Sequence, residues 1–133
     1  MGFLDRFSPQ LLSALRIVSA LLFIAHGTTK LFGFPPTEMF ATPPAPMTLM
    51  WFAGVLEAFG GALLLLGLFT RPVAFVLSGM MAVAYWMAHA PQSVYPVQNG
   101  GDAAILFCFV FLYIAAAGPG PWALDHALFR KKA

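Results

Sequence analysis

A small set of ionisable and polar residues lies within or beside long apolar stretches of the chain. These residues are Arg16, His26, Lys30, Glu57, Tyr85, His89, Asn99, Asp102 and Tyr113. Ionisable groups in an apolar environment are costly, and they usually face a protein interior, where they can transfer protons, bind ligands or pair with one another. A carboxyl group, an imidazole and a phenol among aromatic side chains could exchange protons with a quinone-like molecule and hydrogen-bond to its carbonyl groups. We therefore treat these residues as candidates for a functional site.

Helical spacing groups the candidates of the first two apolar stretches on defined faces. In the first stretch, steps of three and four residues connect Arg16, Ala20, Phe23, Gly27 and Lys30, with His26 at the edge of that face. In the second stretch, Glu57 lies among the small residues Gly54, Ala58 and Gly61. Small residues at this spacing allow another helix to approach closely, so we expect Glu57 to point into a tight helix contact.

The third and fourth stretches each carry a face marked by polar residues. The third groups Ser78, Ala82, Tyr85 and His89, and the fourth groups Asp102, Leu106, Phe109 and Tyr113. The simplest arrangement turns all four marked faces inward, which would form an intramembrane polar cluster or ligand pocket in the outer half.

Each candidate also has a purely structural interpretation. A buried carboxylate without a countercharge is strongly disfavoured, so Glu57 is either neutral or paired with Arg16 or Lys30, and such a pair can simply fix helix register. His89 can be an interfacial residue at a helix end, and Asp102 can be an anion that the helix dipole favours. His26, His89 and Asp102 share no spacing that metal sites use, so we predict no metal site.

Composition sets the environment of these residues. Hydrophobic residues make up 60% of the 133 residues and charged residues 9%, against about 45–50% and about 25% in a soluble domain. This composition excludes a disordered chain. A net charge of +2 offers little neutralisation of phosphates, so we expect no nucleic-acid partner. The lipid bilayer is the expected partner, and the single cysteine, Cys108, permits no internal disulfide.

Four apolar stretches are long enough to span a bilayer, at about 20 residues each. We predict spans at residues 11–32, 47–69, 72–90 and 102–117, separated by glycine and proline, and an all-α transmembrane four-helix bundle within a single domain, residues 1–133. Ser8 and Thr70 are the expected N-terminal caps of the first and third helices.

Four crossings place both termini on one side. That side receives Arg6, Arg71, Arg130, Lys131 and Lys132, whereas the other side has Lys30 at a helix end. Positive charge stays cytoplasmic, so we expect a multi-pass protein of the bacterial inner membrane with cytoplasmic termini. Apolar and charged residues alternate near both ends of the chain, which favours short interfacial segments there.

Several motifs resemble the DoxX family of small four-helix membrane proteins. They include Gly27-x-x-Lys30-Leu31, Glu57-x-x-Gly60-Gly61, Gly67-Leu68-Phe69-Thr70-Arg71, Asn99-Gly100-Gly101-Asp102 and Gly118-x-Gly120 leading to Leu124-Asp125. The resemblance implies an integral inner-membrane protein. The family takes its name from a subunit of a membrane thiosulfate–quinone oxidoreductase, and its members are often linked to sulfur or oxidative metabolism.

Three functions are compatible with these features. The first is a non-catalytic or accessory subunit, linked to redox or sulfur metabolism, which assembles with a redox enzyme or with copies of itself. The second is a quinone-interacting oxidoreductase subunit in which Glu57, His26 and Tyr85 handle protons, with a quinone as cofactor. The third is a small proton-coupled transporter, since ionisable residues lie at several depths. Whether the chain is an enzyme stays open at this stage.

Overall fold

The computed structural model describes residues 2–129, in which every regular element is helical and no strand is present. This confirms the all-α prediction. The helices are α1 (Gly2–Asp5), α2 (Ser8–Phe32), α3 (Leu49–Leu66), α4 (Thr70–Ala84), a π-helical turn η1 (Tyr85–His89), a 3₁₀ turn η2 (Ala90–Gln92), α5 (Pro96–Asn99), α6 (Asp102–Ala117) and α7 (Leu124–Leu128). The basic residues Arg130, Lys131 and Lys132 lie outside the described residues.

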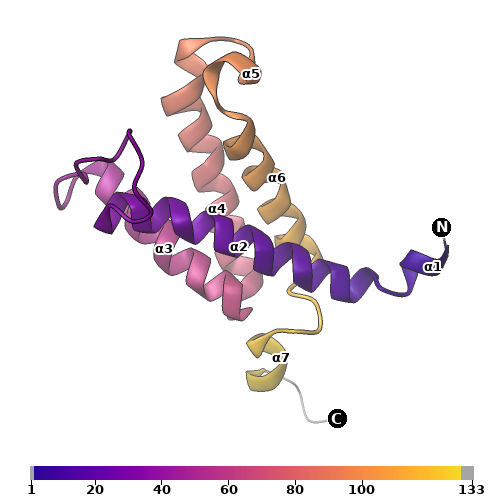
Figure 1. Ribbon diagram of the computed structural model, residues 1–133. Helices are drawn as coiled ribbons and strands as arrows, with labels where there is room; N and C mark the ends of the chain where they lie inside the picture. The colour runs from indigo at the N-terminus through magenta and orange to yellow at the C-terminus, as the bar shows by residue number, and fades with distance from the viewer. Residues whose placement is uncertain (1, 130–133) are drawn as a thin grey trace.

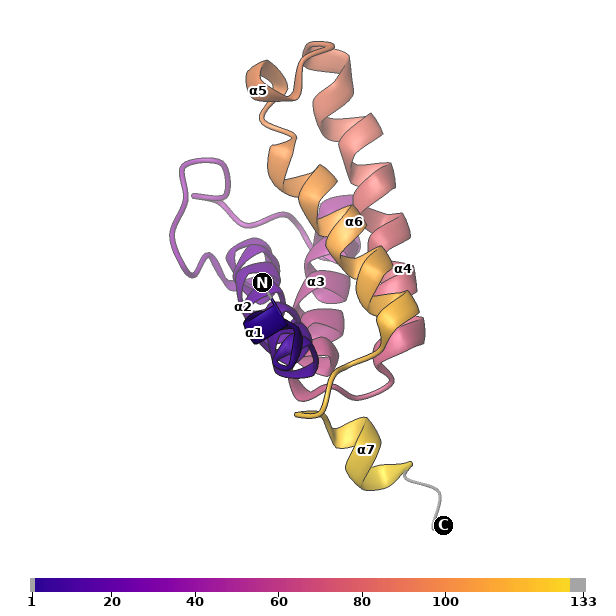
Figure 2. The ribbon, with the colours of Figure 1, turned by 90° about the vertical axis from the view of Figure 1, so that its right-hand side faces the viewer.

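The long helices form two pairs. α2 packs along α3, and α4 packs along α6, as Figures 1 and 2 show. α3 and α4 provide most of the contact between the pairs, with a smaller contact between α2 and α6. The start of α2, the end of α3, the start of α4 and the end of α6 lie toward one end, which we call the terminal end. The pairs diverge toward the opposite end, the loop end, where residues 33–48 lie apart from α5 in both views.

Within the described residues, three helical segments are long and apolar enough to cross a membrane. These are Ser8–Phe32, Leu49–Leu66 and Thr70–Gln92. The fourth predicted span, residues 102–117, coincides with α6. Its 16 residues extend about 24 Å at the rise of an α-helix, against a hydrocarbon core of about 30 Å. The third predicted span, residues 72–90, corresponds to the helical segment Thr70–Gln92. This segment passes Pro91 as a tight 3₁₀ turn and so ends later than predicted.

Both predicted caps were wrong. α2 begins at Ser8 itself, after Phe7, and no side chain caps it. Thr70 is likewise the first residue of α4 rather than its cap, and the preceding Phe69 adopts a left-handed conformation with φ of 51°. The second helix begins two residues later than predicted, because Thr48 caps it by accepting a hydrogen bond from the backbone N–H of Trp51.

Apolar side chains from all four long helices pack together inside the protein. The core is formed by Ala20, Phe23, Leu64, Ala74, Leu77, Met81, Phe111 and Ile114. Phe23 and Phe111 meet edge to face, with ring centroids 5.0 Å apart, a favourable aromatic geometry. Large apolar side chains also cover the outside, such as Phe59 and Phe75, each at least 65% exposed. An outer surface of this kind suits lipid rather than water.

The marked face of α6 points outward, contrary to the prediction. Leu106, Phe109 and Tyr113 are 58–65% exposed, and Asp102 at the start of that face is exposed as well. α6 instead buries Ala104, Phe111 and Ile114 against its neighbours. The reason is that apolar side chains on α6 can face lipid at no cost, and Asp102 at the helix end can reach the membrane rim.

Candidate functional site

Lys30 and Glu57 form a buried ion pair between α2 and α3. The Lys30 ammonium donates to both carboxylate oxygens of Glu57, at 2.7 Å each, and the two side chains are 11% and 5% exposed. Of the alternatives that the sequence left open for Glu57, the structure has the pair with Lys30. A pair of this geometry neutralises two charges that would be very costly alone.

Close packing of the two helix backbones surrounds this ion pair. A Cβ atom added to Gly27 would lie 2.4 Å from the backbone nitrogen of Ala58 and 2.8 Å from the carbonyl oxygen of Gly54. An added Cβ at Gly54 would meet the Cβ of Lys30 at 2.9 Å, and one at Gly61 would meet Ile24 at 2.6 Å. Such distances exclude any larger residue without a shift of the helices.

The loop between α2 and α3 covers the ion pair from the loop end. The Lys30 ammonium lies 5.6 Å from the centroid of the Phe40 ring, a cation–π distance. The hydroxyl of Thr29 donates to the carbonyl oxygen of Pro35 at 2.6 Å. His26, one turn earlier on α2, is exposed and contacts the edge of the Phe107 ring at a centroid distance of 6.0 Å. His26 therefore lies at the exposed edge of the face that carries Lys30, and no hydrogen bond joins it to the ion pair among the described residues.

A second polar cluster lies at the loop end of the other helix pair. It comprises Tyr85, His89 and Asn99. Asn99 is buried, and its amide nitrogen donates to the hydroxyl of Tyr85 at 3.2 Å. The Nδ1 atom of His89 lies 2.9 Å from the carbonyl oxygen of Asn99, and the rings of Tyr85 and His89 stack with centroids 6.4 Å apart. Tyr85 and His89 are the first and last residues of the π-helical turn η1, a feature frequent at functional sites.

Arg16 is isolated from the acidic candidates and lies near the terminal end of α2. It is 1% exposed, and its guanidinium donates hydrogen bonds to the backbone carbonyl oxygens of Pro119 and Trp122. Fourteen residues separate it from Lys30, or about 21 Å along the helix. Arg16 therefore holds the segment that follows α6, and the loop-end clusters lie well away from it.

Sequence reasoning missed the role of Asp125. Its carboxylate accepts hydrogen bonds from the backbone N–H groups of Phe69 and Thr70, at 2.7 and 3.0 Å, and so caps α4 from a distant part of the chain. Partial burial opposes the charge, but the hydrogen bonds from Thr70 and Phe69 outweigh it and lower the pKa of Asp125 below its ordinary value. The motif Leu124-Asp125 singled out this residue in the sequence, but it did not indicate that the carboxylate would cap α4.

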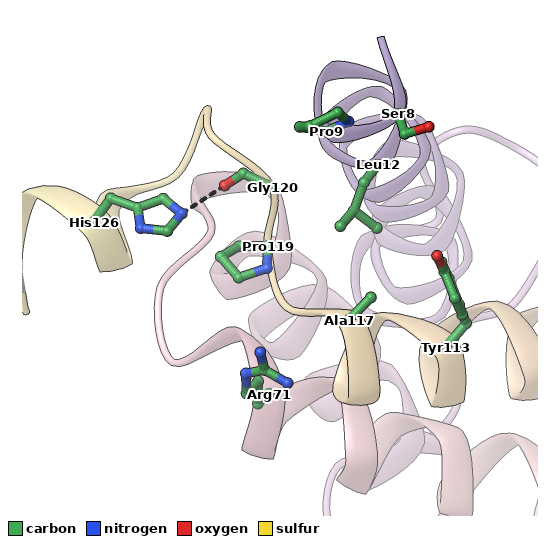
Figure 3. Close-up of a pocket in the computed structure, with 9 residues that line it drawn as sticks. All are labelled: Ser8, Pro9, Leu12, Arg71, Tyr113, Ala117, Pro119, Gly120 and His126. Atoms are coloured by element: carbon green, nitrogen blue, oxygen red, sulfur yellow. Dashed lines mark hydrogen bonds between the residues drawn. The ribbon is translucent and has the colours of Figure 1, made fainter. Parts of the chain in front are cut away.

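A groove with a mixed polar and apolar lining also lies at the terminal end, opposite to the outer-half pocket that the sequence predicted. Figure 3 shows it between the start of α2 and the end of α6, beside the chain at Pro119 and Gly120. Its volume is about 410 Å³, and its lining residues are Ser8, Pro9, Leu12, Arg71, Tyr113, Ala117, Pro119, Gly120 and His126.

Eight of the nine candidate residues thus separate into two clusters and three individual positions, and the ninth, Tyr113, is exposed on α6 and lines the groove. The clusters are the pair Lys30–Glu57 and the trio of Tyr85, His89 and Asn99, while Arg16, His26 and Asp102 lie apart from both. Chemically, the pair fixes two helices, whereas the trio offers a phenol and an imidazole near the loop end.

Long apolar helices with apolar outer surfaces and paired internal charges define this chain as a multi-pass membrane protein. Residues 11–90 match the DoxX family. An uncharacterized protein of Haemophilus influenzae is 41% identical, covering 98% of this chain and 100% of its own length. Inner membrane protein YphA of Escherichia coli is 31% identical over 89% of this chain and 90% of its own. The chain therefore belongs to the DoxX family of inner-membrane proteins.

The name of a more distant relative, from Bacillus subtilis, refers to an enzymatic activity. It is named "Putative oxidoreductase CatD" and is 26% identical to this chain, over 89% of this chain and 87% of its own length. No solved structure matches the chain.

Proposed function

We propose that this protein is a non-catalytic accessory subunit of the inner membrane, linked to redox or sulfur metabolism. In this role the buried charges hold the helices in register so that the outer surface can assemble with a redox enzyme or with further copies of the chain. The proposal also places both termini in the cytoplasm, with four crossings.

One observation carries the proposal: the charges buried in the helices make their contacts within the chain, and of these charged groups only Nε of Arg16 lacks a hydrogen-bond partner among the described residues. Lys30 and Glu57 neutralise each other, and Arg16 donates to two backbone carbonyl groups. Groups occupied in this way support the fold, whereas a catalytic acid or base needs a free position beside its substrate. The polar candidates also fail to converge on one cavity, which favours a packing role over a shared reaction site.

Two further observations support the orientation and the metabolic link. Arg6, Arg16 and Arg71 all lie toward the terminal end in the described residues, and excess positive charge marks the cytoplasmic side. The link to redox chemistry is supported by the name of the Bacillus subtilis relative and by the family resemblance.

The variants Arg16→Leu and Glu57→Leu test the accessory role. We expect both variants to yield less folded, monodisperse protein in mild detergent than the original chain. Any loss of activity in the cell should be no larger than the loss of folded protein. Fold can be followed by far-UV circular dichroism and size exclusion, and activity by quinone reduction in membranes that contain the chain. A Glu57→Leu variant that stays fully folded but abolishes quinone reduction would overturn the accessory role. A cysteine introduced at residue 2, with Cys108 replaced by serine, tests the orientation: we expect an impermeant thiol reagent to label it in inverted membrane vesicles and not in intact cells, and the reverse would overturn the orientation.

A second candidate is a quinone-interacting oxidoreductase subunit, favoured by the cluster at the π-helical turn. Tyr85 and His89 present a phenol and an imidazole near the loop end, and groups of this kind can hydrogen-bond to a quinone carbonyl. This candidate differs from the sequence-based hypothesis because Glu57 is occupied by Lys30 and His26 lies on the surface. It predicts that Tyr85→Phe and His89→Gln weaken the binding of a short-chain quinone at least tenfold while thermal stability is retained. Unchanged binding in both variants would remove it.

A further inference from the structure

The groove at the terminal end combines an apolar wall with an unused hydrogen-bonding edge of an arginine. Leu12 and Pro9 of α2 form one side, and Tyr113 and Ala117 of α6 form the other. In Figure 3 the hydroxyl of Tyr113 points toward α2. The exposed side chains of Leu11 and Leu112 neighbour this lining along the chain, so the groove lies beside a surface that suits lipid.

Arg71 provides the charge of the groove. Its Nη1 atom donates to the carbonyl oxygens of Ala115 and Ala116, the latter contact being the shorter. Among residues 2–129, no hydrogen bond engages its Nε and Nη2 atoms. Those two N–H groups form the edge of a guanidinium that binds phosphate oxygens in pairs.

Gly118 keeps space open beside this edge of Arg71. It has a φ of 89°, and an added Cβ would lie 3.0 Å from Nη2 of Arg71 and 3.6 Å from Nε. A residue with a side chain would therefore crowd the unused N–H groups. The absence of a side chain at Gly118 keeps these N–H groups uncrowded on that side.

The surrounding charges leave Arg71 able to attract an anion. The nearest acidic residue along the chain to the groove lining is Asp125, and its carboxylate is engaged by the backbone N–H groups that begin α4. His126, the next residue, directs Nε2 to the carbonyl oxygen of Gly120 at 2.8 Å. Asp5 lies in α1 beside Arg6 and does not line the groove.

We propose that this groove binds an anionic glycerophospholipid. Its phosphate contacts Nε and Nη2 of Arg71, and the start of an acyl chain lies along Leu12, Tyr113 and Ala117. Basic pockets between transmembrane helices at the membrane interface have the charge and the mixed lining that such lipids require. A zwitterionic lipid brings its own cation next to the phosphate, so it gains less from Arg71. A soluble phosphate lacks the chain that the apolar wall accommodates.

The experiment titrates the purified protein in a neutral detergent with phosphatidylglycerol, with phosphatidylcholine of the same chains, and with glycerol phosphate. Binding is read by native mass spectrometry and by the thermal shift. We expect phosphatidylglycerol to bind and stabilise, and the other two ligands to do so at least fivefold more weakly. Equal effects of phosphatidylcholine, or of glycerol phosphate, would overturn the proposal.

Matched variants locate the site. Arg71→Gln should weaken phosphatidylglycerol binding about fivefold to tenfold, the effect of one basic residue at a membrane surface. Arg6→Gln removes the same charge at the same end, from a residue that contacts Phe3 and Phe7 rather than the groove, and should change binding less than twofold. Because Arg71 also supports the end of α6, Ala117→Trp provides an independent test by filling the groove with all charges intact. Unchanged binding in Ala117→Trp, or an equal loss in Arg6→Gln, would refute the site. None of these three variants touches the buried charges on which the proposed function rests.

Discussion

Removing one partner of the Lys30–Glu57 pair should be far more damaging than removing both. The perturbations are Glu57→Leu, Lys30→Met and the double variant. Methionine is chosen because the stem of Lys30 packs on Gly54, and an unbranched side chain keeps that contact. The comparison isolates the charges from the packing.

The magnitude follows from the geometry of the pair. The ammonium contacts both carboxylate oxygens at 2.7 Å, and both side chains are about nine-tenths buried or more. A charge left alone at such a site costs about 3–5 kcal/mol, whereas replacing both partners by apolar groups is often neutral. We therefore expect each single variant to lose about 3–5 kcal/mol, with the double variant within about 1 kcal/mol of the original.

The assay is reversible unfolding in mixed micelles of increasing dodecyl sulfate content, followed by circular dichroism and fitted as a double-mutant cycle. A coupling free energy of about 3 kcal/mol or more is the expected result. Single losses below about 1 kcal/mol, the range of exposed ion pairs, would refute the argument that this pair is buried from lipid and water alike. Additive losses in the double variant would refute it too.

Three other predictions concern the packing and the segment that follows α6. Gly27→Ala should destabilise the protein by about 2 kcal/mol or more in the same unfolding assay, because the new Cβ meets the backbone of α3 at 2.4 Å. Gly79→Ala is the control, since an added Cβ there has nothing within 4 Å. It should be neutral or stabilise the protein by up to about 1 kcal/mol. Arg16→Leu should expose the chain beyond residue 118 to trypsin and chymotrypsin, while Arg16→Lys should protect it partly; equal digestion of all three proteins would contradict the role of the guanidinium. Asp125→Ala should cost about 1 kcal/mol as the loss of a helix cap. The pKa of Asp125 is lower in the folded protein than in the unfolded chain, so its contribution to stability is complete above the unfolded value of about 3.9 and is lost as the pH falls through the folded value. Below about pH 4, the melting temperature of the original protein should therefore fall more steeply with decreasing pH than that of Asp125→Asn.

Hydropathy and helical spacing predicted most of the fold because both depend on local chemistry. Glycine and proline bounded the apolar stretches, and α6 coincided with its predicted span. On α2 the steps of three and four residues identified a face on which Arg16, Ala20 and Phe23 are at most 1% exposed. The small residues of α3 marked the side that α2 approaches, and the close distances at Gly27 and Gly54 follow from them.

The prediction for α6 was wrong for a reason specific to membranes. Its polar residues were the basis for predicting which face of α6 points inward, although in lipid an apolar residue is favourable on either side of a helix. Asp102 at the first turn can reach the rim, so it places no constraint on the face below it. Size and shape decide instead, and α6 packs inward with Ala104, Phe111 and Ile114.

Long-range hydrogen bonds explain what spacing could not predict at the terminal end. The backbone of the first turn of α4 needs an acceptor, and the chain supplies it 55 residues later through Asp125 rather than through Thr70. Arg16 likewise finds carbonyl oxygens more than 100 residues away instead of a carboxylate. Both contacts hold the chain that follows α6, and its residues Pro119, Gly120 and His126 border the groove beside Arg71. A short segment outside the long helices, rich in glycine and proline, can thus be held in place by one buried cation and one cap, and the shape of the groove depends on both.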